Sequence, residues 1–364
     1  MAACDILISG TGGFAARIAF DIAATAEEPV HVTIAGRNQE RLRWLRTAAN
    51  ARAALFDKKA RFDTHAIDLL SPDAADALLA ATGPRILVQA ASIQTSQVIA
   101  QHGNAWTRLV TEGGLSATAV FQALISARVA AAISRAGTPI PLINCSFPDV
   151  VNSIITALGH DVACGMGNVA ILSNVFAGSA SVPAGAEIKV LAHYQNLAAW
   201  RRPPVERGGT PPRVWIDGSE VDDVFARFAD IQLTPEPVIE ISGASGVPML
   251  LAMAAGREWR GHVPGPNGLP GGYPVRLSQG TLKLDLPAGL TREEAVAWNA
   301  AFEQENGLVV SPAGEARFNG VLREQLTAHL PELAAGFAVS ELESLCQTLL
   351  GVRDRLLNMA AGDR

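Results

Sequence analysis

The chain has 364 residues, which is long enough for two domains with a sizeable hydrophobic core. Hydrophobic residues make up 49% of it and charged residues 18%, proportions that exclude a disordered protein. Its formal net charge of -6 disfavours a nucleic-acid partner, because phosphate binding depends on clustered Lys and Arg.

Short apolar runs alternate with helical patterns in the first part of the chain, as in β-α-β units around a parallel sheet. We expect strands at 5–9, 30–36, 61–68, 85–92, 107–113 and 141–146. We expect helices at 13–26, 38–55 and 117–136, and a further helix after Ser71, with Ser71 as its N-cap. The pattern predicts an α/β fold with a Rossmann-type doubly wound parallel sheet over residues 1–148.

From about Phe147 the strand-like runs cluster, with Pro- and Gly-rich loops between them. They lie at 186–196, 213–218, 237–243, 273–280 and 281–287. Thr291 and Glu294 form a capping box for a helix that Gly307 ends. We therefore expect a second α+β domain with a mostly antiparallel sheet, which holds the substrate, over residues 149–330.

Residues 331–364 form the tail, where leucines recur on one helical stripe from Leu342 to Leu356. We expect a C-terminal helix that packs back on the first domain or on the partner subunit of a homodimer.

The four cysteines lie far apart, and no Cys or His spacing is typical of a metal site, so no metal is expected. The N-terminus has no basic segment followed by an apolar signal core. The longest uncharged run, 162–186, is broken by Gly, Asn, Ser and Pro. These features predict a cytoplasmic protein with no membrane span and a small-molecule substrate.

The first strand runs into a glycine-rich turn with G-x-G-x-x-A spacing. Gly10 allows a tight turn, Gly12 lets the backbone approach a pyrophosphate, and Ala15 permits close helix packing. The helix that follows would then offer its N-terminal N–H groups to the phosphates. We predict a dinucleotide site formed here by Gly10, Thr11, Gly12, Gly13, Phe14 and Ala15.

The end of the second strand indicates which dinucleotide binds. NAD sites place an acidic residue there for the ribose hydroxyls, whereas this chain has Arg37, with Asn38 and Arg41 nearby. An Arg can bind a 2′-phosphate through two charge-assisted hydrogen bonds, so we predict NADP. The alternative is that Arg37 is simply solvated at the start of a helix.

Two further segments belong to the predicted cofactor site. Asp68, just past the third strand, contacts the adenine or caps a helix. Ala90, Ala91 and Ser92 end the fourth strand, where small side chains let the nicotinamide half pass over the backbone.

Ligands of open α/β sheets bind outside the carboxyl ends of the strands. The sixth expected strand ends in NCSFPDVVN, where Asp149 and Asn152 lie one helical turn apart. They serve as substrate or proton-transfer ligands, or Asp149 belongs to a capping box whose cap is Ser146.

His193 ends an expected strand of the second domain, and a histidine suits proton transfer near neutral pH. The alternative is a hydrogen-bonded structural histidine. His262 is a weaker candidate, and Arg201 and Arg202 either hold a substrate carboxylate or are solvated. We expect His193 and Asp149 to converge across one cleft.

The segments ISGTGGFAARIA, IAGRNQERL, VQAAS and NCSFPDVVN resemble those of the saccharopine dehydrogenase-like oxidoreductases. Within that group, FPDVVN followed by a strand histidine resembles the opine-type dehydrogenases. The resemblance covers about the first 150 residues. It implies NADPH-dependent reduction of an imine formed from an amine and an α-keto acid, with Asp149 and His193 at the positions of the active-site Asp and His.

The residues leave two other functions open. One is an NADP-dependent carbonyl reductase, which uses the same machinery. The other is a non-enzymatic NADP-binding regulator, which needs no proton donor facing the nicotinamide.

Overall fold

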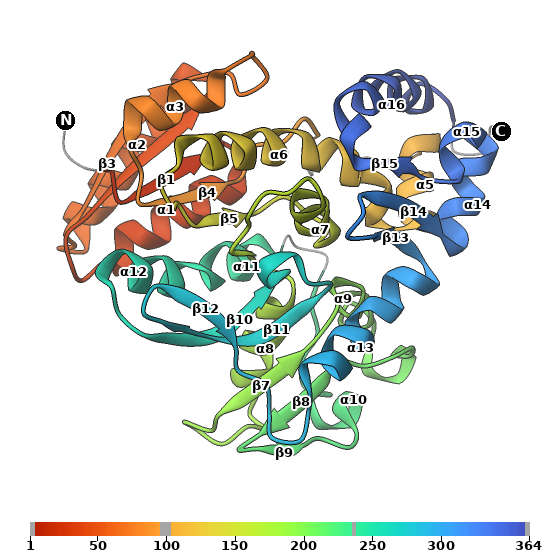
Figure 1. Cartoon of the computed structure of the whole chain (residues 1–364). Helices are drawn as coiled ribbons and strands as arrows, with labels where there is room; N and C mark the ends of the chain where they lie inside the picture. Colours follow the sequence, from red (N-terminus) through yellow and green to blue (C-terminus); the bar gives the residue numbers. More distant parts are fainter. Residues whose placement is uncertain (1–3, 95–102, 235–237, 361–364) are drawn as a thin grey trace.

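The computed structural model describes residues 4–94, 103–234 and 238–360 (Figure 1). Its first part is built on a six-stranded sheet with the order β3-β2-β1-β4-β5-β6, in which every neighbouring pair is parallel. The strands are β1 (Ile6–Ser9), β2 (Val30–Gly36), β3 (Ala60–Ala66), β4 (Ile86–Gln89), β5 (Leu142–Asn144) and β6 (Cys164–Gly165). The predicted Rossmann-type sheet is confirmed, and it takes its sixth strand from beyond residue 148.

Helices cover both faces of this sheet. They include α1 (Gly13–Thr25), α2 (Gln39–Leu55), α3 (Ala74–Thr82), α6 (Ala119–Ala136) and α7 (Val150–Ala157). The helix α6 ends, as expected, at Gly137, whose φ is 65°. The helix after Ser71 begins two residues later than predicted, with Asp73 rather than Ser71 at its N-cap.

Two expected strands are helices. Residues 107–113 belong to α5 (Ala105–Gly113), where Asn104 Oδ1 accepts the N–H of Thr107 at 2.9 Å. Its buried residues include Trp106, Leu109, Val110 and Gly113, which is helical spacing in a run short enough to resemble a strand.

The second of these errors concerns 237–243, of which residue 237 lies outside the described part. The rest falls in α11 (Ile239–Ser245), which packs on α1. A Cβ at Gly243 would lie 2.5 Å from Cγ of Arg17, so the small residue permits this close packing. The apolar pattern at 237–243 thus reflects contact with α1 rather than pairing in a sheet.

The second part holds three antiparallel sheets of three strands each. They comprise β7 (Ile188–Leu191), β8 (Arg213–Ile216) and β9 (Ser219–Glu220); β10 (Trp259–Pro264), β11 (Gly272–Ser278) and β12 (Thr281–Leu284); and β13 (Gly307–Val310), β14 (Glu315–Asn319) and β15 (Phe337–Ala338). The predicted α+β class of this part is confirmed.

The helices of the second part are mostly short. They are α8 (Val169–Ala177), α9 (Leu197–Trp200), α10 (Val224–Arg227), α11, α12 (Val247–Ala255), α13 (Arg292–Glu305), α14 (Gly320–His329), α15 (Pro331–Ala334) and α16 (Leu342–Leu357). The capping box of Thr291 and Glu294 at the start of α13 is confirmed, and α13 ends before Gly307.

The core continues across both parts of the chain. Successive strand residues face opposite sides of the parallel sheet: Leu7 joins one cluster, and Ile6 and Ile8 join another. The first cluster extends through α6 to the C-terminal helices, and the second extends to β10–β12. A third surrounds Trp200 and Phe176. The helices α5 and α6 therefore pack against α16, the dark blue helix in Figure 1.

Within the described residues one helix, Leu115–Ala136, is long and apolar enough to cross a membrane. In this structure 89% of that stretch is buried by other elements, so it serves as a core helix. The division of the chain at residues 148 and 330 stays a prediction.

The turn after β1 gives a test of the fold. Gly10 has a φ of 124°, and a Cβ there would lie 2.9 Å from the carbonyl carbon of Ala90. We expect Gly10→Ala to lower the free energy of unfolding by about 1–3 kcal/mol, because both strain and a backbone collision result. Gly12→Ala is the matched control: its Cβ meets nothing within 4 Å, so urea denaturation should show a change below about 0.5 kcal/mol. Equal losses in both variants would contradict this explanation.

Candidate functional site

The glycine turn leads directly into the first turn of α1. Gly12 is the N-cap, and no side chain caps the helix among the described residues. Gly12 and Gly13 are exposed, and a Cβ at Gly12 would point into open space. The turn therefore leaves N–H groups at a helix N-terminus accessible, which fits a pyrophosphate.

Arg37, Asn38 and Arg41 border this turn. Asn38 caps α2 by accepting the N–H of Arg41 at 2.9 Å, and Nε of Arg41 donates to the carbonyl of Thr11 at 3.2 Å. The guanidinium of Arg37 is 62% exposed and lies 3.7 Å from a carboxylate oxygen of Asp68. The other oxygen of Asp68 accepts the N–H of Leu70 at 3.0 Å, which stabilises a local turn.

The segment after β4 closes the other side of the turn. Ala90 donates its N–H to the carbonyl of Ser9 at 2.7 Å, and a Cβ on Gly10 would touch Ala90 and Ala91. Ser92 Oγ donates to the carbonyl of Gln94 at 2.7 Å. The residues predicted for the cofactor site thus lie along one edge, at the carboxyl ends of β1, β2 and β4.

These features fit a dinucleotide. The described residues contain no group of three or more His, Cys, Asp or Glu side chains that could hold an ion.

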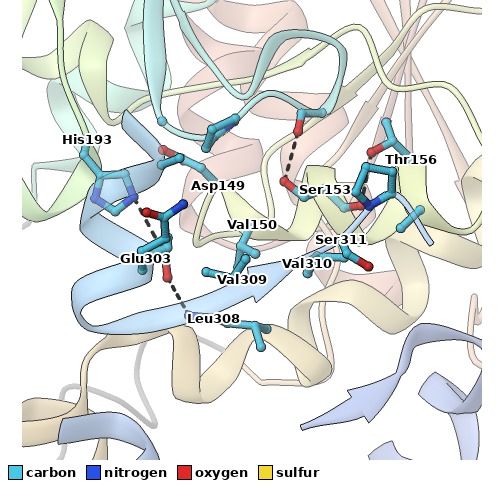
Figure 2. Close-up of a pocket in the computed structure, with 17 residues that line it drawn as sticks. Asp149, Val150, Ser153, Thr156, His193, Glu303, Leu308, Val309, Val310 and Ser311 are labelled. Atoms are coloured by element: carbon cyan, nitrogen blue, oxygen red, sulfur yellow. Dashed lines mark hydrogen bonds and ion pairs between the residues drawn. The ribbon is translucent and has the colours of Figure 1, made fainter. Parts of the chain in front are cut away.

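A cavity of about 290 Å³ lies along α7, the helix that follows β5. Its walls come from α7, from the end of α13, from β13 and from the loop between β10 and β11 (Figure 2). At one end of it Asp149, His193 and Glu303 point toward one another. The volume is at the lower end of the range for small-molecule pockets, about 300–1,000 Å³.

Asp149 enters this cavity from the first part of the chain. It follows β5 and precedes α7, and its side chain does not cap that helix; Ser146 instead hydrogen-bonds Ser126 at 3.1 Å, so the predicted alternative of a capping box is wrong. Oδ1 accepts a hydrogen bond from the amide of Asn168, just after β6. Oδ2 is buried and has no hydrogen-bond partner among the described residues. Burial raises the pKa of Asp149 to about 6, with Glu303 adding to the rise while His193 and Asn168 oppose it.

Asn168 is itself held in an unusual backbone conformation. Its φ is 44° and its ψ is -103°, a region that costs about 1–3 kcal/mol for a residue with a side chain. Such strain is found at functional sites, and here it accompanies the contact between Asn168 and Asp149.

His193 enters from the second part, two residues after β7, and is 1% exposed. Its Nδ1 accepts the N–H of Gln195 at 3.4 Å, which leaves the proton of the neutral ring on Nε2. Nε2 lies 3.3 Å from Oε1 of Glu303, and the ring stacks on Phe302 with centroids 4.9 Å apart. These contacts fix the orientation of the ring.

Glu303 is a buried carboxylate with several donors. Leu308 donates its N–H at 2.6 Å and Ser116 its hydroxyl at 3.0 Å, in addition to Nε2 of His193. Because Ser116 donates to Glu303, the hydroxyl of Tyr194 donates to Ser116 at 3.1 Å. Burial raises the pKa of Tyr194 well above its usual value, so it remains a donor. This network compensates the cost of burying the charge of Glu303.

Other sequence candidates have structural contacts. Asn152 accepts from Asn144 at 2.8 Å and donates to the carbonyl of Gly265 at 3.0 Å, and it does not line the cavity. Nε2 of His262 accepts the N–H of Val190 at 2.9 Å, and burial lowers its pKa to about 3. Arg201 and Arg202 are exposed and also lie outside the cavity.

Sequence reasoning missed Glu303 and Asn168. Glu303 lies on the buried face of α13 with Ala295 and Asn299, at a spacing of four residues. A polar pair repeated on the buried face of an amphipathic helix was therefore the available signal. Asn168 follows a two-residue strand that carries no comparable pattern.

No known protein family matches this sequence, and no curated protein matches it. Solved structures do resemble it in fold. A malate dehydrogenase from Cryptosporidium parvum aligns with a TM-score of 0.51 at 14% identity, over 82% of this chain and 96% of its own. A minor L-lactate dehydrogenase from Enterococcus mundtii aligns with a TM-score of 0.52 at 14% identity, over 83% and 96%. These likenesses show a shared two-part architecture with a Rossmann-type sheet.

The raised pKa of Asp149 predicts a pH-dependent stability. Between about pH 4 and pH 6 the folded chain binds a proton that the unfolded chain has lost, so stability falls as pH rises through this range. Asp149→Asn removes this titration and keeps an oxygen that can accept from Asn168. We expect the variant to be more stable than the wild type by on the order of 2 kcal/mol at pH 7.5, and equally stable near pH 4.

Urea denaturation at both pH values measures this difference. Asp222→Asn, on the exposed Asp222, serves as the control for a general charge effect. A stability difference between Asp149→Asn and wild type that does not change with pH would contradict the prediction.

Proposed function

We propose that the protein is an NADPH-dependent oxidoreductase that reduces a C=N bond of a small amine-derived substrate. The observation that carries this proposal is the meeting of Asp149 and His193 in one cavity, where α7 follows the carboxyl end of β5. The fold shared with malate and lactate dehydrogenases supports a nicotinamide-dependent reaction. A regulator that only binds the dinucleotide would not need buried proton-transfer groups at this position.

The proposal of NADP rather than NAD rests on the residues that follow β2. Arg37 is exposed at its end, and Arg41 is held against Thr11 by a hydrogen bond. Asp68 lies beside Arg37, but one of its oxygens is already bound to the N–H of Leu70. A 2′-phosphate would replace the weak exposed contact between Arg37 and Asp68 with a shorter charge-assisted one.

The bound dinucleotide would supply a hydride to the carbon of the C=N bond. Asp149 accepts a hydrogen bond from the substrate nitrogen through Oδ2 and stabilises its positive charge. As the hydride adds to carbon, the π electron pair of C=N moves to nitrogen. His193 first takes a second proton from solvent, Glu303 stabilises the resulting imidazolium, and the Nε2 proton passes to the imine nitrogen before the hydride adds, which creates the positive charge that Asp149 stabilises. The net change is one imine and one proton converted to one amine, with two electrons taken from the dinucleotide.

A carbonyl reductase remains the second candidate, because the structural neighbours are named as dehydrogenases of malate and lactate. The same His193 proton would then reach an alkoxide oxygen. NADPH absorbance with a preformed cyclic imine and with aldehydes or ketones, supplied separately, distinguishes the two. We expect the imine to be the better substrate, because Oδ2 of Asp149 can accept from an N–H and not from a carbonyl oxygen.

Cofactor choice is tested by Arg37→Ala. We expect the Kd for NADPH to rise about 10- to 100-fold and that for NADH to change little, because only NADPH carries the phosphate that Arg37 would bind. Arg43→Ala removes a charge from the exposed face of α2, the helix that follows Arg37, and should change neither Kd. Fluorescence titration measures both. Equal binding of NADH and NADPH by the wild type would refute the NADP assignment.

The proton-transfer roles are tested by His193→Gln and Asp149→Asn. We expect each to lower kcat by about 10²- to 10⁴-fold while the Kd for NADPH stays unchanged. His329→Gln, at the end of α14 and outside the cavity, is the matched histidine control. Variants that fold like the wild type and keep its kcat would rule out these roles.

A further inference from the structure

The titratable side chains that line the cavity are two carboxylates and one imidazole. Asp149, Glu303 and His193 lie at one end, and the described residues that line the rest include no Lys or Arg. A substrate carboxylate placed in this cavity would therefore meet two acids and no described Lys or Arg, which is costly for a buried charge.

Three hydroxyl groups and the amide of Gln304 line the cavity, and Ser311 accepts the N–H of Glu315 at 3.1 Å, while the other two hydroxyl groups donate to backbone carbonyls. Ser153 donates to the carbonyl of Gly268 at 2.9 Å, and Thr156 donates to the carbonyl of Ser153 or Asn152 at 3.1–3.2 Å. Apolar groups supply most of the remaining wall: Val150, Ala157, Pro270, Val309, Val310 and Pro312. The wall away from Asp149 thus fits a hydrocarbon group better than an anion.

One buried acceptor in the cavity lacks a donor. Oδ2 of Asp149 has no partner among the described residues, although the residue is only 6% exposed. An unpaired buried carboxylate oxygen is unfavourable, and a cationic N–H group is the donor that best compensates it. The acidic end therefore has an unused position for a ligand that carries positive charge on nitrogen.

We propose that the substrates of this site are cationic amines or iminium ions with an apolar remainder and no carboxylate. This inference rests on the proposed reduction of a C=N bond and narrows its substrate class. It departs from the amine and keto-acid pair that the sequence resemblance implies, and from the hydroxy acids after which the structural neighbours are named.

Binding of matched six-carbon probes tests the inference without any cofactor. By calorimetry at pH 8, where Asp149 is ionised, n-hexylamine should bind at least 10-fold more tightly than hexanoate. Asp149→Asn and Glu303→Gln should each weaken hexylamine binding about 10- to 100-fold and leave 1-hexanol binding unchanged. Glu305→Gln removes an acid from the exposed face of the same helix as Glu303 and should leave hexylamine binding unchanged.

A gain-of-function variant covers the case in which the acidic variants do not fold. Val309→Lys would place a cation in the apolar wall, and it should weaken hexylamine binding and strengthen hexanoate binding. The inference is overturned if wild type binds hexanoate as tightly as hexylamine, or if folded Asp149→Asn and Glu303→Gln bind hexylamine like wild type.

A different measurement, the oxidation of NADPH, tests the proposed reaction. If hexylamine binds as expected and no imine or carbonyl oxidises NADPH, the ligand class holds and the reaction is wrong. If imines that carry a carboxylate are reduced and hexylamine does not bind, the reaction holds and the ligand class is wrong.

Discussion

The contact between His193 and Glu303 is the interaction around which the cavity is organised. It joins the end of β7 to the last turn of α13, and through Leu308 and Ser116 it also fixes β13 and the segment before α6. A buried carboxylate is tolerated only where donors surround it, so these four segments must meet in one arrangement. The position of Asp149 relative to His193 follows from that arrangement.

Much of the first part could be predicted from the sequence because its signals are local. The strand, the glycine turn and the helix from Ile6 to Thr25 follow one another without interruption. The second part relies on contacts between distant residues, and there the apolar patterns were ambiguous. Residues 107–113 and 239–245 are helices because each packs against another helix, which a short apolar run does not reveal.

In the candidate site, too, local signals could be predicted from the sequence and long-range contacts could not. Asp149 and His193 could be proposed because each follows a recognisable strand. Asn152, on the same helix as Asp149, has a different environment, since its amide is bound at both ends to Asn144 and Gly265. Glu303 and Asn168 could not be assigned, because their partners lie far away in the sequence and only the tertiary structure brings them together.

The packing of α16 against α5 and α6 has a consequence for the order of folding. The core on one face of the parallel sheet is completed by Leu342, Leu349 and Leu356, which leave the ribosome long after the sheet itself has been made. During synthesis the apolar surface of α6 would wait uncovered until these residues arrive. Contacts at such sequence separation slow folding and expose hydrophobic surface, so the nascent chain is most open to aggregation while α6 is uncovered.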